Sequence, residues 1–138
     1  MAIEKLTALG FGVAEDEWHV LQTARPNVLL IGADRTVAGF LDLLLPLLRH
    51  PITRSRDGAR ILPEHLGGTL ILHDVGRLDE DGQRGVSLWL AESNRDTQVI
   101  STASCPLYPL VEREALSAPL YYSLNVLMLT LRDPAAPG

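Results

Sequence analysis

One candidate binding segment follows a short apolar run at residues 27–31. Gly32, Arg35 and Thr36 come directly after this run, at the start of a stretch with helical apolar spacing. The first N–H groups of a helix have no partners inside the helix and attract negative charge. These three residues could therefore hold an anion.

A second candidate, the pair His73 and Asp74, follows the apolar run 69–72. His73 could be a hydrogen-bonded structural histidine, a contact that responds to pH, or a metal ligand. Asp74 could cap the loop that follows it, or it could contact a metal ion or a partner. The other histidines lack the spacing of zinc motifs, so we expect no metal site.

Arginine supplies most of the positive charge, and three arginines lie close together in a segment without clear periodicity. These are Arg54, Arg56 and Arg60. They could form a solvated loop, or they could contact an anion or a partner. The sequence alone favours the solvated loop, because charged clusters in irregular segments usually face water.

The composition excludes several function classes. The chain has 138 residues and a net charge of −5, which argues against broad binding of nucleic acid. Its only lysine is Lys5, so no interior amine exists for a Schiff base or a phosphate loop. Its only cysteine, Cys105, excludes an internal disulfide and fits a reducing compartment. No apolar stretch is long enough to span a bilayer, and we expect a cytoplasmic protein with one domain.

The elements that must position these residues alternate between strand and helix along the chain. Strands are expected at 27–31, near Ile52, at 69–72, at 97–102 and at 126–131. Helices are expected at 13–24, at 35–49 with a kink or early end at Pro46, and at 79–93 with Asp79 as N-cap, with shorter turns at 63–66, 109–116 and 119–124. This alternation predicts a three-layer α/β fold with a mostly parallel sheet. We expect an N-terminal helical segment at 1–26, the α/β core at 27–131 and a flexible tail at 132–138.

Four sequence blocks, in order, resemble the AAA+ ATPase domain of bacterial sigma-54-dependent transcription activators. The run GGTLILHDVGRL at 67–78, with Gln83 after it, is similar to that family's GGTLFLDEIGEL…Q block. QVISTA at 98–103 resembles VRVIAATN, and LYYSLNV at 120–126 resembles LYYRLNV. NVLLIG at 27–32 lies where the family has PVLLTGESGTGK. The resemblance implies a P-loop NTPase-like core.

The resemblance also implies a phosphate-binding loop, and this chain departs from it. Val37 stands in place of the loop's second glycine, and Ala38 stands in place of its lysine. A β-branched residue resists the positive φ that such a loop often uses. Asp34 adds negative charge beside the expected phosphate. We therefore interpret the following residues as vestigial nucleotide-loop positions: Gly32, Asp34, Arg35, Thr36, Val37 and Ala38.

The other catalytic positions implied by the resemblance differ as well. His73 stands where an acidic residue helps to hold Mg²⁺, a cation that prefers oxygen ligands. Asp74 is one methylene shorter than the glutamate that orients the attacking water. Ser104 aligns with a sensor asparagine, and Ser117 and Ser123 align with two arginine fingers. We expect no catalytic residues and no ATP hydrolysis.

Two larger parts implied by the family are also missing. The segment between Leu48 and Gly67 is too short for the GAFTGA loop that contacts sigma-54, and the chain ends before a lid subdomain. We therefore predict an inactive interaction or regulatory module in bacterial transcription regulation or signalling, with a protein partner or self-association but no contact with nucleic acid or membrane. The alternative is a sensor that binds ATP or ADP without hydrolysis. A helix that starts directly at Asp34 or Arg35 would argue against the sensor.

Overall fold

The computed structural model describes residues 3–56, 62, 67–92 and 96–135. Five strands form one sheet in the order β2-β3-β4-β1-β5, and every neighbouring pair is parallel. The strands are β1 (Val28–Ile31), β2 (Ile52–Ser55), β3 (Gly68–Leu72), β4 (Thr97–Ala103) and β5 (Leu127–Thr130). The predicted α/β fold with a parallel sheet is confirmed, and β2 is the predicted edge strand.

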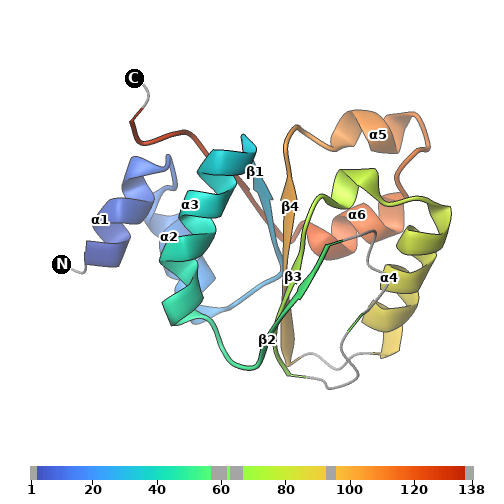
Figure 1. Cartoon of the computed structure of the whole chain (residues 1–138), viewed down its shortest axis with the longest axis horizontal. Coiled ribbons are helices and arrows are strands. Elements are labelled where there is room, and N and C mark those ends of the chain that lie inside the picture. The colour runs from blue at the N-terminus through green and yellow to red at the C-terminus, as the bar shows by residue number, and fades with distance from the viewer. Residues whose placement is uncertain (1–2, 57–61, 63–66, 93–95, 136–138) are drawn as a thin grey trace.

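Helices cover both faces of this sheet (Figure 1). The α-helices are α1 (Ile3–Gly10), α2 (Glu15–Thr23), α3 (Asp34–Leu44), α4 (Glu80–Glu92), α5 (Tyr108–Glu112) and α6 (Ala118–Leu124). Two short 3-10 helices, η1 (Leu45–Leu47) and η3 (Val75–Arg77), follow α3 and β3. In Figure 1, α1, α2 and α3 lie on one side of the strands, and α4, α5 and α6 lie on the other.

The apolar core is split into two clusters by the sheet. Side chains alternate between the faces of a strand, so Val28 and Leu30 pack with α1, α2 and α3, whereas Leu29 and Ile31 pack against the opposite layer. All four are buried. This double burial explains why the strand is a continuous apolar run in the sequence.

The ends of the helices follow the predicted signals. The α3 helix ends at Leu44, and Pro46 lies in η1, because proline has no N–H to continue the helical ladder. The carboxylate of Asp79 accepts a hydrogen bond from the Gly82 N–H at 2.7 Å, which confirms its predicted capping role. The helical turn predicted at 63–66 lies outside the described residues. No helix in the described ranges is long and apolar enough to cross a membrane.

Candidate functional site

The segment predicted to be a vestigial phosphate loop is mostly helix. Only Gly32 and Ala33 separate β1 from α3, which begins at Asp34. The Gly32 N–H donates to the Ala103 carbonyl at 3.1 Å, and the Val37 N–H donates to the Ala33 carbonyl at 2.9 Å. These backbone groups are used inside the fold, so they cannot wrap a phosphate.

The space beside Gly32 is also filled. A Cβ atom placed on Gly32 would lie 3.3 Å from the Leu131 carbonyl oxygen and 3.6 Å from Cγ2 of Val37. Thr36 and Val37 are buried, whereas Ala38 is exposed. The threonine and the valine therefore anchor the start of α3 to the core.

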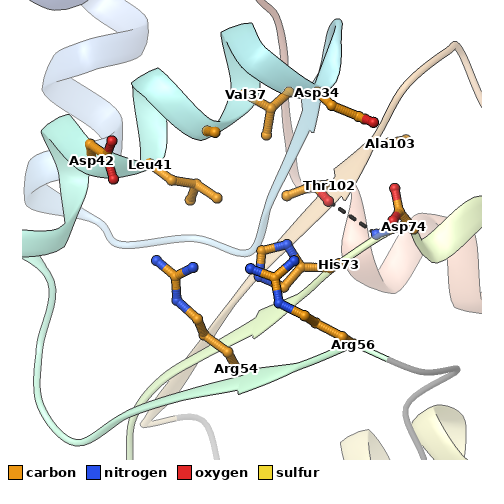
Figure 2. A pocket seen from close by; sticks show the side chains of 11 residues that line it. Asp34, Val37, Leu41, Asp42, Arg54, Arg56, His73, Asp74, Thr102 and Ala103 are labelled. Atoms are coloured by element: carbon orange, nitrogen blue, oxygen red, sulfur yellow. Dashed lines mark hydrogen bonds between the residues drawn. The ribbon is translucent and has the colours of Figure 1, made fainter.

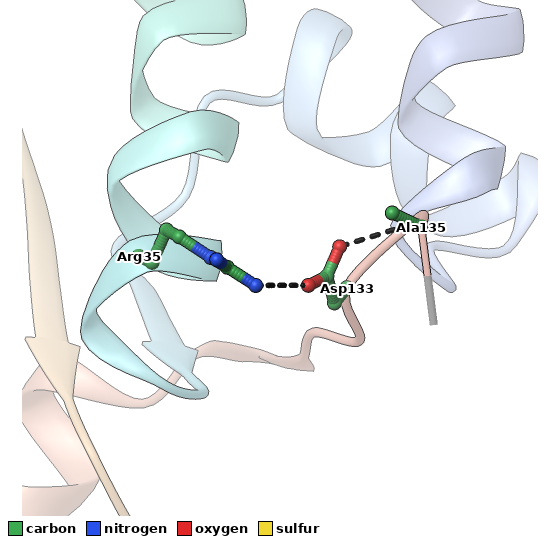
Figure 3. Close-up of polar contacts among 3 residues, drawn as sticks. All are labelled: Arg35, Asp133 and Ala135. Atoms are coloured by element: carbon green, nitrogen blue, oxygen red, sulfur yellow. Dashed lines mark hydrogen bonds and ion pairs between the residues drawn. The ribbon is translucent and has the colours of Figure 1, made fainter. Parts of the chain in front are cut away.

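Arg35, which the sequence indicated as a possible anion contact, is paired within the chain. Its Nη2 lies 2.8 Å from Oδ2 of Asp133, in the segment that follows β5 (Figure 3). The Ala135 N–H donates to the other carboxylate oxygen at 2.9 Å. This hydrogen bond, and then the contact with Arg35, lower the pKa of Asp133 below its usual range. The contacts tie part of the predicted flexible tail, residues 132–135, to the start of α3.

His73 lines a pocket, and its main chain is hydrogen-bonded to β2. Its main-chain N–H donates to the Ser55 carbonyl at 3.0 Å, and its ring is half-buried. Within the described part of the chain, the buried Nε2 atom has no hydrogen-bond partner. Burial lowers the pKa of His73, and the nearby guanidinium groups of Arg56 and then Arg54 lower it further, while Asp74 opposes them weakly. His73 is therefore neutral at pH 7.

The predicted capping role of Asp74 is wrong. Asp74 adopts the left-handed conformation, with φ of 55° and ψ of 53°, and its side chain makes no capping hydrogen bond to η3. Its main-chain N–H instead donates to Oγ1 of Thr102 at 3.0 Å (Figure 2). The Asp74 side chain is exposed. Within the described ranges, no cluster of three or more His, Cys, Asp or Glu residues could hold a metal ion.

A pocket of about 280 Å³ lies between α3 and the carboxyl ends of β2, β3 and β4 (Figure 2). It brings together five of the predicted site residues: Asp34, Val37, Ala38, His73 and Asp74. The remaining lining residues are Leu41, Asp42, Arg54, Arg56, Thr102 and Ala103. Among the residues predicted for the site, Gly32, Arg35, Thr36 and the three serines do not line it.

The two arginines of the pocket are the residues that sequence reasoning placed wrongly. Arg54 lies in β2 rather than in a loop, whereas Arg56 follows this strand by one residue, and both side chains are exposed. The loop prediction is therefore wrong for Arg54, and the solvent exposure predicted for both is confirmed. Their spacing of two residues was the available signal, because residues i and i+2 of a strand point to the same face. Arg60 lies outside the described residues.

The serines at the predicted sensor and finger positions have structural roles or face solvent. Ser117 caps α6: its Oγ accepts a hydrogen bond from the Leu120 N–H at 3.3 Å. Its own N–H donates to the side-chain oxygen of buried Gln83 at 2.8 Å. Ser123 Oγ donates to the Pro119 carbonyl at 2.9 Å, and Ser104 is exposed after β4.

His73 should make the stability of the fold depend on pH. Because its pKa is lower in the folded chain than the ordinary value of 6.5, the unfolded chain binds more protons between these two values. The free energy of unfolding should therefore fall as the pH drops below 6.5. A His73→Gln variant should lose less stability over the same range, measured as urea midpoints on both sides of pH 6.5. His19→Gln, at an exposed position on α2, is the matched control. If both variants lost equally little stability below pH 6.5, the pH dependence could not be attributed to His73.

Comparisons with known proteins agree with this architecture. The NtrX protein from Brucella abortus in complex with ATP matches with a TM-score of 0.64 and 15% identity, over 95% of this chain and 37% of that chain. The complex of the same protein with ADP matches with a TM-score of 0.63 and 14% identity, over 93% of this chain and 34% of that chain. This chain therefore spans about a third of the NtrX chains. The P-loop NTPase domain of the sigma-54 transport activator from E. coli matches with a TM-score of 0.55 and 19% identity, over 81% of this chain and 94% of that chain.

These solved structures establish the shared P-loop NTPase-like fold and confirm that prediction. A comparison with curated proteins gives no match. The family model of the sigma-54 interaction domain matches residues 42–133, about two thirds of the chain. This match includes three of the four sequence blocks and confirms the predicted resemblance, whereas the block at 27–32 lies outside it. The chain therefore belongs to the sigma-54 interaction domain family.

Proposed function

We propose that this chain is a catalytically inactive member of the family that serves as an interaction or regulatory module in bacterial transcription regulation or signalling. The observation that carries the proposal is the start of α3 directly at Asp34. A nucleotide-hydrolysing domain needs a loop of free N–H groups around the phosphates and a lysine beside them. Here the corresponding residues are helical, and Ala38 is in the position of the lysine.

The residues around the pocket support loss of hydrolysis as well. Phosphoryl transfer depends on groups that hold the metal ion, orient water and neutralise the transition state. A neutral His73 offers no negative charge to a metal ion, and Ser117 and Ser123 are used to build α6. Inactivity would thus result from several independent changes rather than from one.

An exposed apolar surface supports a role in protein interaction. Four large side chains on α5, α6 and the start of β5 are exposed: Tyr108, Tyr122, Val126 and Met128. Edge-to-face ring contacts through Tyr121 join two of them, with ring centroids 6.1 Å and 5.2 Å apart. Exposed aromatic side chains of this kind are enriched at protein interfaces. In this role the protein would act in the cytoplasm, through a protein partner or a second copy of itself.

The proposal is tested by ATP binding and hydrolysis of the full chain. We expect no phosphate release above background and no saturable heat in calorimetric titrations with ATP or ADP and Mg²⁺ at millimolar concentration. We also expect that the double variant Val37→Gly and Ala38→Lys restores neither, because the backbone around these residues remains helical. Saturable ATP binding that Arg35→Ala weakens would instead support the nucleotide sensor.

The interaction role needs its own measurement. Light scattering should show self-association, or affinity capture should show a stable partner. Tyr122→Ser should weaken the association, whereas Leu88→Ser, at an exposed position on α4, should not. A strictly monomeric chain without a captured partner would contradict the interaction role, even if ATP hydrolysis is absent.

A further inference from the structure

The floor of the pocket is built by three neighbouring strands. The register pairs Ser55 with Leu72 and Leu72 with Ser101. One residue further along each strand, Arg56, His73 and Thr102 therefore lie side by side, on the face that α3 covers. Arg54 lies on the same face, two residues before Arg56. Figure 2 shows both arginine side chains reaching up from β2 toward His73 and α3.

Both arginines are available to a ligand. Arg54 and Arg56 are exposed, and neither forms an ion pair with any residue that the structure describes. This contrasts with Arg35, which is paired to Asp133, and with Arg84, which is paired to Asp81. Two unpaired guanidinium groups beside one pocket can bind both oxygens of an oxyanion.

The electrostatic field at the floor is positive. At His73, the charges of Arg56 and Arg54 outweigh the opposing charge of Asp74. The carboxylates of Asp34 and Asp42 belong to the opposite wall, on α3. The pocket is therefore positive at the strand side and negative at the helix side, so it should admit a small anion and repel a polyanion.

We propose that this pocket binds a small oxyanion, a carboxylate or phosphate group, between the guanidinium groups of Arg54 and Arg56 and beside His73. His73 occupies the position where the family resemblance implies a carboxylate that helps to hold a cation. The site would therefore prefer an anion instead of a cation. The proposal goes beyond the inactive interaction module, because it gives this module a small ligand. It can fail while that function stands, since it does not depend on ATP or on a protein partner.

The test is a titration of the isotope-labelled full chain, followed by NMR at constant ionic strength. Inorganic phosphate, sodium acetate and ATP are the three probes. We expect saturable shifts of the Arg54, Arg56 and His73 signals with phosphate or acetate, and the tighter of the two identifies a phosphoryl or a carboxylate ligand. ATP should bind more weakly than phosphate, because Asp34 and Asp42 repel its additional charge. Shifts without saturation at millimolar concentration for both small anions would overturn the proposal.

Variants separate the site from general charge effects. The double variant Arg54→Gln and Arg56→Gln should weaken binding by about tenfold or more. Arg84→Gln, which removes the same charge from α4, should leave it unchanged. Asp42→Asn should strengthen phosphate binding. The proposal would be overturned if Arg84→Gln weakened phosphate binding as much as the double variant does. It would also be overturned if Asp42→Asn weakened phosphate binding.

The His73 ring gives an independent readout. An oxyanion between the arginines would offset their charge, so the pKa of His73 should rise when phosphate or acetate is saturating. By linkage, the anion should bind more tightly as the pH falls through this pKa. The charged groups that act on the ring are Arg54 in β2, Arg56 directly after this strand and Asp74 after β3. Asp34 and Asp42 line the same pocket from α3. An unchanged His73 titration at saturating anion would contradict binding at this place.

Discussion

Replacing Phe40 by alanine should lower the free energy of unfolding by about 3–5 kcal/mol. The Phe40 side chain is fully buried in the core cluster beneath α1, α2 and α3. Its ring meets Phe11 and Trp18 edge to face, with centroids 5.4 Å and 6.5 Å away. Truncation would remove both ring contacts and leave a cavity among helices that relax only partly. Because a domain is stable by only about 5–15 kcal/mol, this loss is a large share of the total.

The Phe40 prediction is checked by urea unfolding followed by tryptophan fluorescence. Leu88→Ala is the control, because Leu88 is 58% exposed on α4 and its truncation should change stability by less than about 0.5 kcal/mol. The loss of stability in Phe40→Leu should lie between those of Phe40→Ala and Leu88→Ala, since leucine keeps most of the apolar volume. A Phe40→Ala variant as stable as Leu88→Ala would show that the three helices do not depend on this ring.

Gly68→Ala should cost about 3 kcal/mol or more, or prevent folding. Gly68 opens β3 with φ of +74°, and a Cβ there would lie 2.7 Å from the Pro51 nitrogen and overlap the Pro51 carbonyl oxygen. That same oxygen accepts the Thr69 N–H at 2.9 Å, which fixes the start of β2 against β3. Neither backbone can move away without breaking the contact between the two strands.

Gly67→Ala is the matched control for Gly68. Gly67 also has a positive φ, of +101°, but a Cβ there would meet no atom within 4 Å. Its cost should be backbone strain alone, about 1–3 kcal/mol. The difference between the two urea midpoints therefore isolates the steric overlap with Pro51. Equal midpoints would contradict the close approach of Pro51 to Gly68.

The two glycines also show what sequence reasoning could and could not find. The Gly67–Gly68 pair was recognisable as part of the block that resembles sigma-54 activators, and the strand after it was predicted within one residue. The close approach of Pro51 to Gly68 depends on how β2 lies beside β3, and no local pattern records that placement. The strands were predictable because burial on both faces makes them continuous apolar runs.

The site was predicted less well than the fold. Substitutions at Val37 and Ala38 were visible in the sequence, because the resemblance supplied a pattern to depart from. The position of Arg35 at the start of a helix suggested an anion contact, whereas the structure pairs it with Asp133, which lies 98 residues away along the chain. The resemblance gave no reason to place Arg54 and Arg56 in the pocket, because none of the four matching blocks includes β2.

The sequence by itself determined the class of fold, the order of strands and helices, and the loss of the lysine that phosphate chemistry requires. The first two properties depend on residue type and on periodicity, which are local and can be read along the chain, whereas the lost lysine is visible only against the family's sequence blocks. Only the tertiary structure decided which polar groups face one another. The parallel register brings Arg56 beside His73, and the segment after β5 brings Asp133 to Arg35. Charge interactions act through space, so the same arginines that are ordinary in the sequence make one end of the pocket positive.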